Sequence, residues 1–112
     1  HFRSSDPARV AGWIREEFAW DVELPAVQGA RCRLVGARRC RIQGRPAAFA
    51  LYEMEGAPAS LVILEGADGA PFVDRCRGHT VIARRSGTLL FAAVGRLPER
   101  ELEHLMPGGA PR

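Results

Sequence analysis

The sequence predicts an α+β domain: an antiparallel sheet of about five strands, with an N-terminal and a C-terminal helix packed on it. Three observations support this prediction. Apolar residues recur at helical spacing near the two ends of the chain, within residues 7–18 and 98–106. Between these segments, short apolar runs alternate with turns that contain glycine or proline, which is typical of strands. The 112 residues suffice for one core, and no linker divides them.

We therefore expect a single domain over residues 1–112, with a lead at 1–5, a globular core at 6–106 and a frayed tail at 107–112. The chain begins at His1, already close to a helix start, which suggests a piece of a longer protein. All sixteen basic residues are arginine, but a net charge of +3 is too small to indicate nucleic-acid binding by itself. No apolar run approaches the roughly 18 residues of a membrane span.

The first helix is predicted over residues 7–18. Asp6 is a good N-cap, and Pro7 suits the first helical position. Apolar side chains then follow at helical spacing, with charged residues on the other side: Val10, Trp13, Ile14 and Phe18. Residues 20–29 show no period and predict a connecting loop, with three aliphatic residues turned inward: Val22, Leu24 and Val27.

A long hairpin is predicted over residues 31–55. On its first strand the even positions are mostly apolar and the odd positions mostly arginine, so the pattern places Cys32 and Cys40 together on the core face. The arginines at 31, 33, 39 and 41 would then share a solvent face. They would either keep that face soluble or dock an acidic partner or a phosphate backbone. Arg38 breaks the alternation, and Gly36 just before it is a natural position for a bulge.

The turn of this hairpin is predicted at Gly44-Arg45, which would pair Ile42 with Ala47 and Cys40 with Phe49. The second strand, residues 47–54, is apolar on both faces. That pattern is typical of a central strand that is covered on both sides.

The second half of the chain predicts three more strands, two of them in a hairpin, and a final helix. After a turn at 55–58, residues 60–64 form a buried strand that pairs antiparallel with the strand before it. Residues 66–78 are expected to form a mobile loop. Residues 80–85 and 88–94 form a hairpin around Ser86-Gly87 that pairs Ile82 with Phe91 and Ala83 with Leu90. The last helix begins near Pro98, ends before Pro107, and buries three residues: Leu102, Leu105 and Met106.

Three cysteines and one histidine form the weak thiol or metal signal: Cys32, Cys40, Cys76 and His79. An odd number of cysteines at irregular spacing is no disulfide framework. Only Cys76 and His79 have the close spacing of a zinc-ligand pair. Buried, inert thiols are the first interpretation, while a disulfide, a redox-responsive pair and a metal site remain open.

Catalysis has little support in the sequence. No nucleophile motif accompanies the three histidines His1, His79 and His104. The serines lie at cap, turn and strand-start positions, and the glutamates at 16–17 and 99–103 lie on helix surfaces. No glycine-rich loop that would cradle phosphate precedes a helix. We therefore expect a protein that is not an enzyme and has no cofactor.

Several short motifs occur along the chain in a defined order: Ser4-Ser5-Asp6-Pro7 with Val10 and Trp13, Pro25-Ala26, Leu34-Val35-Gly36-Ala37-Arg38, Gly44-Arg45-Pro46-Ala47-Ala48, and a closing strand and helix at 90–94 and 99–105. This order resembles the extracytoplasmic part of bacterial transmembrane anti-sigma factors. The resemblance extends over nearly the whole chain. Its structural signature consists of Trp13, Gly36, Gly44, Arg45 and Pro46. The three cysteines depart from the pattern of that family, which also supplies no catalytic residues.

The resemblance implies a non-catalytic sensory domain on the periplasmic side of the inner membrane. It would belong to a single-span protein that controls an extracytoplasmic-function sigma factor. Sigma binding and membrane attachment would need a cytoplasmic domain and an upstream helix that these 112 residues do not contain. The expected partner is another envelope protein or a small signal, and not nucleic acid. Two alternatives stay open: a thiol- or metal-responsive sensor using Cys32, Cys40 and Cys76, and a basic nucleic-acid-binding module.

Overall fold

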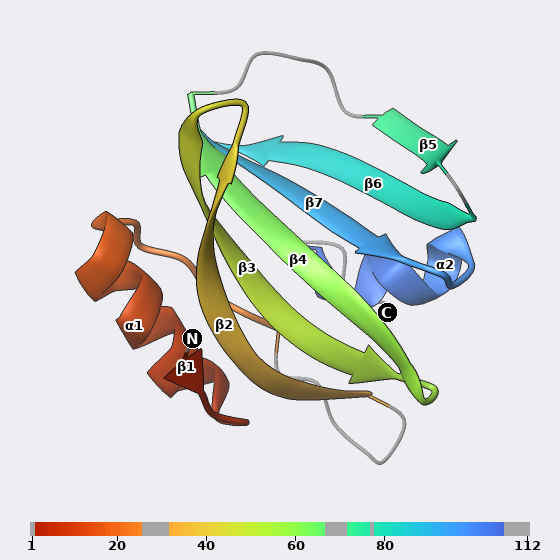
Figure 1. Ribbon diagram of the computed structural model, residues 1–112, viewed down its shortest axis with the longest axis horizontal. Coiled ribbons are helices and arrows are strands. Elements are labelled where there is room, and N and C mark those ends of the chain that lie inside the picture. Colours follow the sequence, from red (N-terminus) through yellow and green to blue (C-terminus); the bar gives the residue numbers. More distant parts are fainter. Residues whose placement is uncertain (1, 26–31, 67–71, 77, 107–112) are drawn as a thin grey trace.

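A computed structural model describes residues 2–25, 32–66, 72–76 and 78–106, without the side chains of 72–76. One antiparallel sheet has the strand order β1-β2-β3-β4-β7-β6-β5 (Figure 1). The strands are β1 (Phe2–Arg3), β2 (Cys32–Ile42), β3 (Arg45–Met54), β4 (Ala57–Glu65), β5 (Phe72–Cys76), β6 (His79–Ser86) and β7 (Leu89–Gly95). The helices are α1 (Pro7–Phe18), α2 (Glu99–Leu102) and the 3₁₀ turn η1 (Glu103–Leu105). The predicted α+β class is confirmed.

The sheet is larger than the five strands predicted. Within the described ranges, six strands have five or more residues, and β1 adds a two-residue strand in the segment expected to be a lead. β5 lies in the segment expected to be a mobile loop, so that prediction is wrong for residues 72–76. Residues 67–71 and 77 of the same prediction lie outside the described ranges. Both extra strands are short and lie at the sheet edges, where pairing with a long neighbour defines them more than their own composition does.

Helix α1 has the bounds that the sequence predicts. The side chain of Asp6 accepts a hydrogen bond of 3.0 Å from the backbone N–H of Ala8, and Val10 and Ile14 are fully buried. The helix ends at Ala19, whose φ of 62° is left-handed and whose N–H donates to the Arg15 carbonyl at 2.9 Å. Neither helix in the described ranges has both the length and the apolar character that a membrane span needs.

Two-residue turns connect β2 to β3 and β3 to β4. In the first, Gln43 and Gly44 both have positive φ, 51° and 81°, as a type I′ turn requires. The predicted turn at Gly44-Arg45 is therefore wrong by one residue. Ile42 pairs with Arg45, and Cys40 pairs with Ala47 rather than with Phe49.

The second of these turns uses the same chemistry. Glu55 and Gly56 have φ values of 52° and 79°. β4 consequently begins at Ala57, earlier than the predicted start at residue 60. In both turns, the type I′ geometry matches the right-handed twist of the strands. Glycine takes the second central position of the turn, so the first central position is the residue before glycine.

The turn between β6 and β7 consists of Gly87 and Thr88, not Ser86-Gly87. Gly87 has a φ of 63° at the first central position, where a type II′ turn needs glycine. Ser86 therefore pairs with Leu89, and Ile82 pairs with Ala93 instead of Phe91. The prediction had the correct strands and a register that was wrong by two residues.

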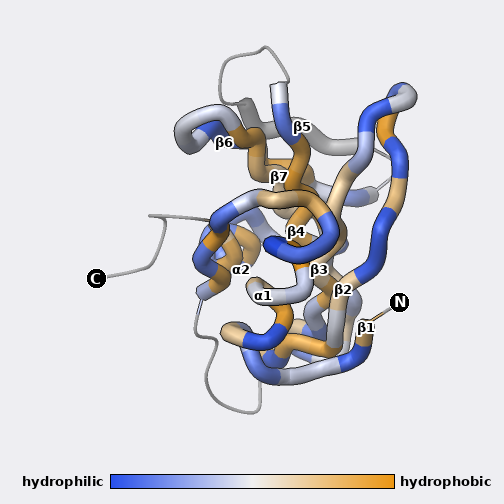
Figure 2. Tube along the Cα trace, turned by 90° about the vertical axis from the view of Figure 1, so that its left-hand side faces the viewer, coloured by the Kyte–Doolittle hydropathy of each residue, from blue (hydrophilic) through white to orange (hydrophobic). Residues whose placement is uncertain are grey.

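The core lies between the helices and one face of the sheet. Val10 and Ile14 of α1, together with the predicted Leu102, Leu105 and Met106, pack against the inward side chains of β2–β4, β6 and β7. The loop after α1 adds Leu24, which is buried as predicted, and Val22, which is partly buried; Val27 lies outside the described ranges. Figure 2 shows β4 and β7 as largely hydrophobic segments.

The opposite side of the sheet carries a second, smaller apolar cluster. It consists of three buried residues and five partly buried ones: Ala47, Val62 and Leu64, with Ile42, Phe49, Leu90, Ala92 and Val94. We call this surface the open face, because neither described helix contributes to its cluster. The prediction that β3 is covered on both sides is therefore met on one side only within the described residues.

Gly36 lies in the part of β2 that pairs with β1. Phe2 pairs with Ala37 and Arg3 pairs with Gly36. A Cβ atom on Gly36 would lie 2.3 Å from the carbonyl oxygen of Phe2, so only glycine fits beneath β1. The register of β2 against β3 shifts between Leu34 and Gly36, which confirms the predicted bulge.

Candidate functional site

The bulge separates the two cysteines of β2. Cys32 pairs with the buried Met54 and packs against the helix-side core. Beyond the bulge the alternation of side chains is reversed, so Cys40 pairs with Ala47 of the open face. The prediction that Cys32 and Cys40 share the core face is therefore wrong. Both are free thiols, and a disulfide between them would have to pass through the sheet.

The same reversal divides the arginines of β2. Arg33 lies on the open face and forms a 2.9 Å ion pair with Glu53, its neighbour on β3. Beyond the bulge, Arg39 pairs with the buried Ala48 and turns to the helix side, while Arg38 turns to the open face. Among the described residues, Arg33 lies on the other side of β2 from Arg39 and Arg41, so the predicted continuous arginine face does not form there; Arg31 lies outside the described ranges. This arrangement gives no basic stripe along β2 that would follow a phosphate backbone.

Cys32 is partly buried. Burial raises the pKa of its thiol, and the nearby carboxylate of Glu101 raises that pKa further. Burial also raises the pKa of the Tyr52 phenol, and Cys32 adds to the shift. The Tyr52 hydroxyl is buried and has no hydrogen-bond partner among the described atoms. A thiol with a raised pKa is a poor nucleophile and a poor metal ligand near neutral pH.

The other two residues of the thiol signal lie in the β5–β6 pair. Cys76 and His79 are partners in its register, and the side chain of Cys76 lies outside the described part. Among the residues that the structure does describe, no three of His, Cys, Asp and Glu are grouped so that they could hold a metal ion.

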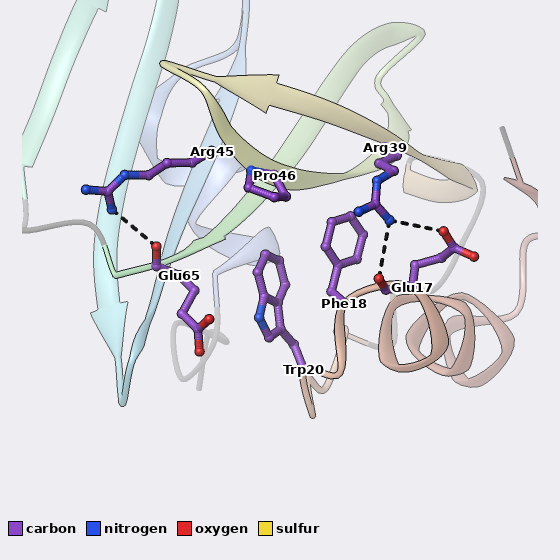
Figure 3. Close-up of a pocket in the computed structure, with 7 residues that line it drawn as sticks. All are labelled: Glu17, Phe18, Trp20, Arg39, Arg45, Pro46 and Glu65. Carbon is purple, nitrogen blue, oxygen red and sulfur yellow. Dashed lines mark hydrogen bonds and ion pairs between the residues drawn. The ribbon is translucent and has the colours of Figure 1, made fainter.

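A cleft of about 440 Å³ lies between the C-terminal end of α1 and the β2–β3 turn. Figure 3 shows its seven lining residues: Glu17, Phe18, Trp20, Arg39, Arg45, Pro46 and Glu65. They come from α1 and the loop after it, from the two strands of the first hairpin, and from the end of β4. The volume falls within the range of small-ligand sites.

The apolar floor of the cleft exists because α1 ends abruptly at Ala19. The left-handed conformation of Ala19 reverses the chain, which places Trp20 on Phe18 with ring centroids 4.6 Å apart and ring planes within 20°. Two further contacts continue this aromatic row, from Phe18 to Trp13 and from Trp13 to Phe2. Stacked aromatic pairs contribute roughly 0.5–1.5 kcal/mol beyond their buried area, so these contacts hold Phe18 and Trp20 in place at the floor of the cleft.

Two arginines stand at opposite sides of this floor (Figure 3). Arg39 donates from Nη1 to the Glu17 carboxylate at 3.1 Å and to its carbonyl at 3.3 Å, and its guanidinium carbon lies 4.7 Å from the Phe18 ring centroid. Arg45 donates from Nη1 to the Glu65 carbonyl at 3.3 Å. Each arginine therefore lies beside a glutamate, and the formal charges of the lining cancel.

The lining has the groups with which a ligand could be bound. It combines an apolar floor of Phe18, Trp20 and Pro46 with charges of both signs at two sides. A ligand with an apolar centre and both charges, such as a short peptide segment, matches these groups.

Two of the five signature residues line the cleft, namely Arg45 and Pro46. The other three support the fold: Trp13 belongs to the aromatic row, Gly36 admits β1, and Gly44 forms the turn. Sequence reasoning missed Phe18, Trp20 and Arg39 as lining residues. The signal that could have indicated the cleft is Trp20, just past the helix end. A large aromatic side chain at that place in a loop needs apolar side chains to pack against.

The comparisons with known proteins found no match: no family model fits the chain, and no curated protein is similar enough in sequence to count as a relative.

Proposed function

We propose that this chain is the non-catalytic sensory domain, on the periplasmic side of the membrane, of a membrane-anchored anti-sigma factor. The proposal rests on the order of motifs along the chain, which resembles that family. The observation that carries it is the position of the Gly44-Arg45-Pro46 motif, because the first two residues of β3, directly after the turn, line the cleft. In a sensory domain, the cleft is where a signal molecule or peptide binds.

The contacts of the cleft suggest how a signal would act. Arg39 connects β2 to the last turn of α1, and Arg45 connects the start of β3 to the end of β4. A ligand that competes for either guanidinium would loosen one of these connections. The Arg39–Glu17 ion pair is exposed, and such pairs contribute only about 0–1 kcal/mol, so the binding energy of a small ligand suffices to replace it.

The test uses the full-length protein together with its sigma factor and a reporter promoter. We expect Arg45→Ala to alter the response of the reporter to envelope stress while the amount of protein stays unchanged. Arg96→Ala is the matched control, since Arg96 is also exposed and lies outside the cleft. The same response in both variants would count against the cleft as the sensory site.

The identity of the whole protein is tested separately. The proposal requires a membrane helix and a zinc-binding cytoplasmic segment upstream in the full-length reading frame, and inhibition of the sigma factor by that segment. A full-length protein without them would refute the anti-sigma assignment, whatever the cleft binds.

A further inference from the structure

The two ends of the cleft differ in how their charges are paired. At the α1 end, Arg39 and Glu17 form an ion pair of 3.1 Å. At the other end, Arg45 donates to the backbone carbonyl of Glu65 and not to its carboxylate. Within the described residues, neither the Arg45 guanidinium nor the Glu65 carboxylate forms an ion pair. One cation and one anion, both exposed, are therefore free at the same end of the cleft.

Trp20 supplies a third polar group at this end. Its side chain is only 8% exposed, yet its indole nitrogen has no hydrogen bond to any described residue. Figure 3 shows this nitrogen on the edge of the ring that is turned toward Arg45 and Glu65 and away from Phe18. In the described part, only the Tyr52 hydroxyl is both fully buried and unpaired, so the Trp20 nitrogen reaches the cleft. Buried indole N–H groups normally have an acceptor, which here has to enter the cleft.

These three groups together select a ligand with both charges close to each other. The Arg45 guanidinium and the Trp20 indole both donate, and a carboxylate accepts from two donors at once. The Glu65 carboxylate beside them accepts from an ammonium group. An anion alone would be repelled by Glu65, and a cation alone by Arg45. An α-amino acid carries a carboxylate and an ammonium group on one carbon atom, so it satisfies all three groups.

The remaining lining determines what the rest of the ligand is. The floor beside this polar end is apolar and consists of Phe18, Pro46 and the ring of Trp20. The volume of about 440 Å³ is near the lower end of the range for small-ligand sites, roughly 300–1,000 Å³. The floor therefore favours a small ligand with one apolar side chain.

We propose that the cleft binds a free α-amino acid with an apolar side chain. Its carboxylate accepts from Arg45 and from the Trp20 indole, its ammonium group donates to Glu65, and its side chain lies on Phe18 and Pro46. This inference rests on the proposed function, because it names the ligand class of the same cleft.

The test titrates L-leucine into the chain and follows calorimetry and indole chemical shifts. Trp13 and Trp20 are the two tryptophans of the sequence, so Trp13 is an internal control. Leucine should move the Trp20 indole signal and leave that of Trp13 in place. N-acetyl-leucine lacks the ammonium group, leucinamide lacks the carboxylate, and glycine lacks the apolar side chain. Each of the two capped forms should bind at least about ten-fold more weakly than leucine, because each loses a charged hydrogen bond. Glycine should also bind more weakly.

Three conservative variants separate the roles of the polar groups. Trp20→Phe keeps an aromatic ring in the floor and removes the donor, while Arg45→Gln and Glu65→Gln remove one charge each. Each should weaken leucine binding by about ten-fold or more. Glu65→Gln should also bind leucine and N-acetyl-leucine equally, which a merely structural role of Glu65 would not produce.

Arg96→Gln and Glu16→Gln are the matched controls, because both residues are exposed and lie outside the cleft. Both should keep the affinity of the wild-type chain.

The absence of leucine binding, equal affinity for leucine and its capped forms, or unchanged affinity in all three cleft variants would overturn the inference. None of these results would refute the proposed function, which the reporter response of Arg45→Ala tests. Conversely, leucine binding together with an unaltered reporter response in Arg45→Ala would refute the sensory role and leave this inference in place.

Discussion

The substitution Gly36→Ala tests the close contact between β1 and β2. The new Cβ would lie 2.3 Å from the Phe2 carbonyl oxygen, and real structures essentially never contain such contacts below 3.0 Å. β1 must therefore move away by about 0.7 Å or more. This shift strains the pairing of Phe2 with Ala37 and the 3.1 Å hydrogen bond from Ser4 N–H to the Val35 carbonyl.

The expected cost combines overpacking with weakened backbone hydrogen bonds. Inserting a methyl group into a packed site typically costs about 1–3 kcal/mol, and each lost hydrogen bond about 1 kcal/mol. Because β1 has two residues and lies at the sheet edge, it can also detach, which limits the loss to what its contacts contribute. We expect Gly36→Ala to lower the free energy of unfolding by about 1–3 kcal/mol, measured by urea denaturation with an unchanged m-value.

Gly12→Ala is the matched control, with the opposite sign. No atom lies within 4 Å of a Cβ built on Gly12, which lies in the interior of α1. Alanine should raise stability there by up to about 1 kcal/mol, because glycine is the weaker helix former. A chain that lacks residues 1–3 provides the second control, since Gly36→Ala should then cost little. If Gly36→Ala costs nothing in the full chain, or costs the same without β1, the steric explanation is wrong.

Three further predictions concern single side chains. Asp6→Ala removes the N-cap hydrogen bond to Ala8 and should lower stability by about 1 kcal/mol in thermal denaturation, whereas Asp6→Asn should retain most of it. Arg84→Ala breaks the partly buried ion pair with Glu103 and should lower stability by about 1 kcal/mol; equal stability at low and high salt in the wild-type chain would contradict that origin. Burial raises the pKa of Tyr52 above that of the unfolded chain, so the folded state retains the proton longer, and stability that is complete below about pH 10 should fall as the pH rises beyond that value. Tyr52→Phe should reduce this alkaline loss and cost little at neutral pH, because no described atom bonds the hydroxyl; a large loss at neutral pH would reveal a partner.

The elements that sequence predicted best are those whose signals are local. α1 has its cap, its proline and its apolar spacing within twelve residues, and both of its ends agree with the prediction. The final helix buries Leu102, Leu105 and Met106 as its spacing indicates, although its second half is a 3₁₀ turn. The hairpin strands were also recognisable. Their registers were not, because the turn type depends on strand twist as well as on the position of glycine.

The candidate site was harder to predict, because its parts are distant in sequence. Trp20, Arg39 and Glu65 come from three separate elements and meet only when α1 packs beside the β2–β3 turn. Arg45 and Pro46 were singled out as a motif, without a sign that they line a cleft. The thiol hypothesis was weakened for a related reason, since one extra residue at the bulge sends Cys32 and Cys40 to opposite faces.

By itself, the sequence determined the α+β class, the bounds of α1, the bulge near Gly36 and the apolar character of both faces of β3. Each of these depends on residue types within one or two turns or strands. Only the tertiary structure decided which face each described arginine and cysteine of β2 occupies, that β1 pairs with β2 at Gly36, and that a second apolar cluster forms on the side of the sheet opposite the helices. These features depend on pairing between distant strands, where a shift of one residue reverses every side chain that follows.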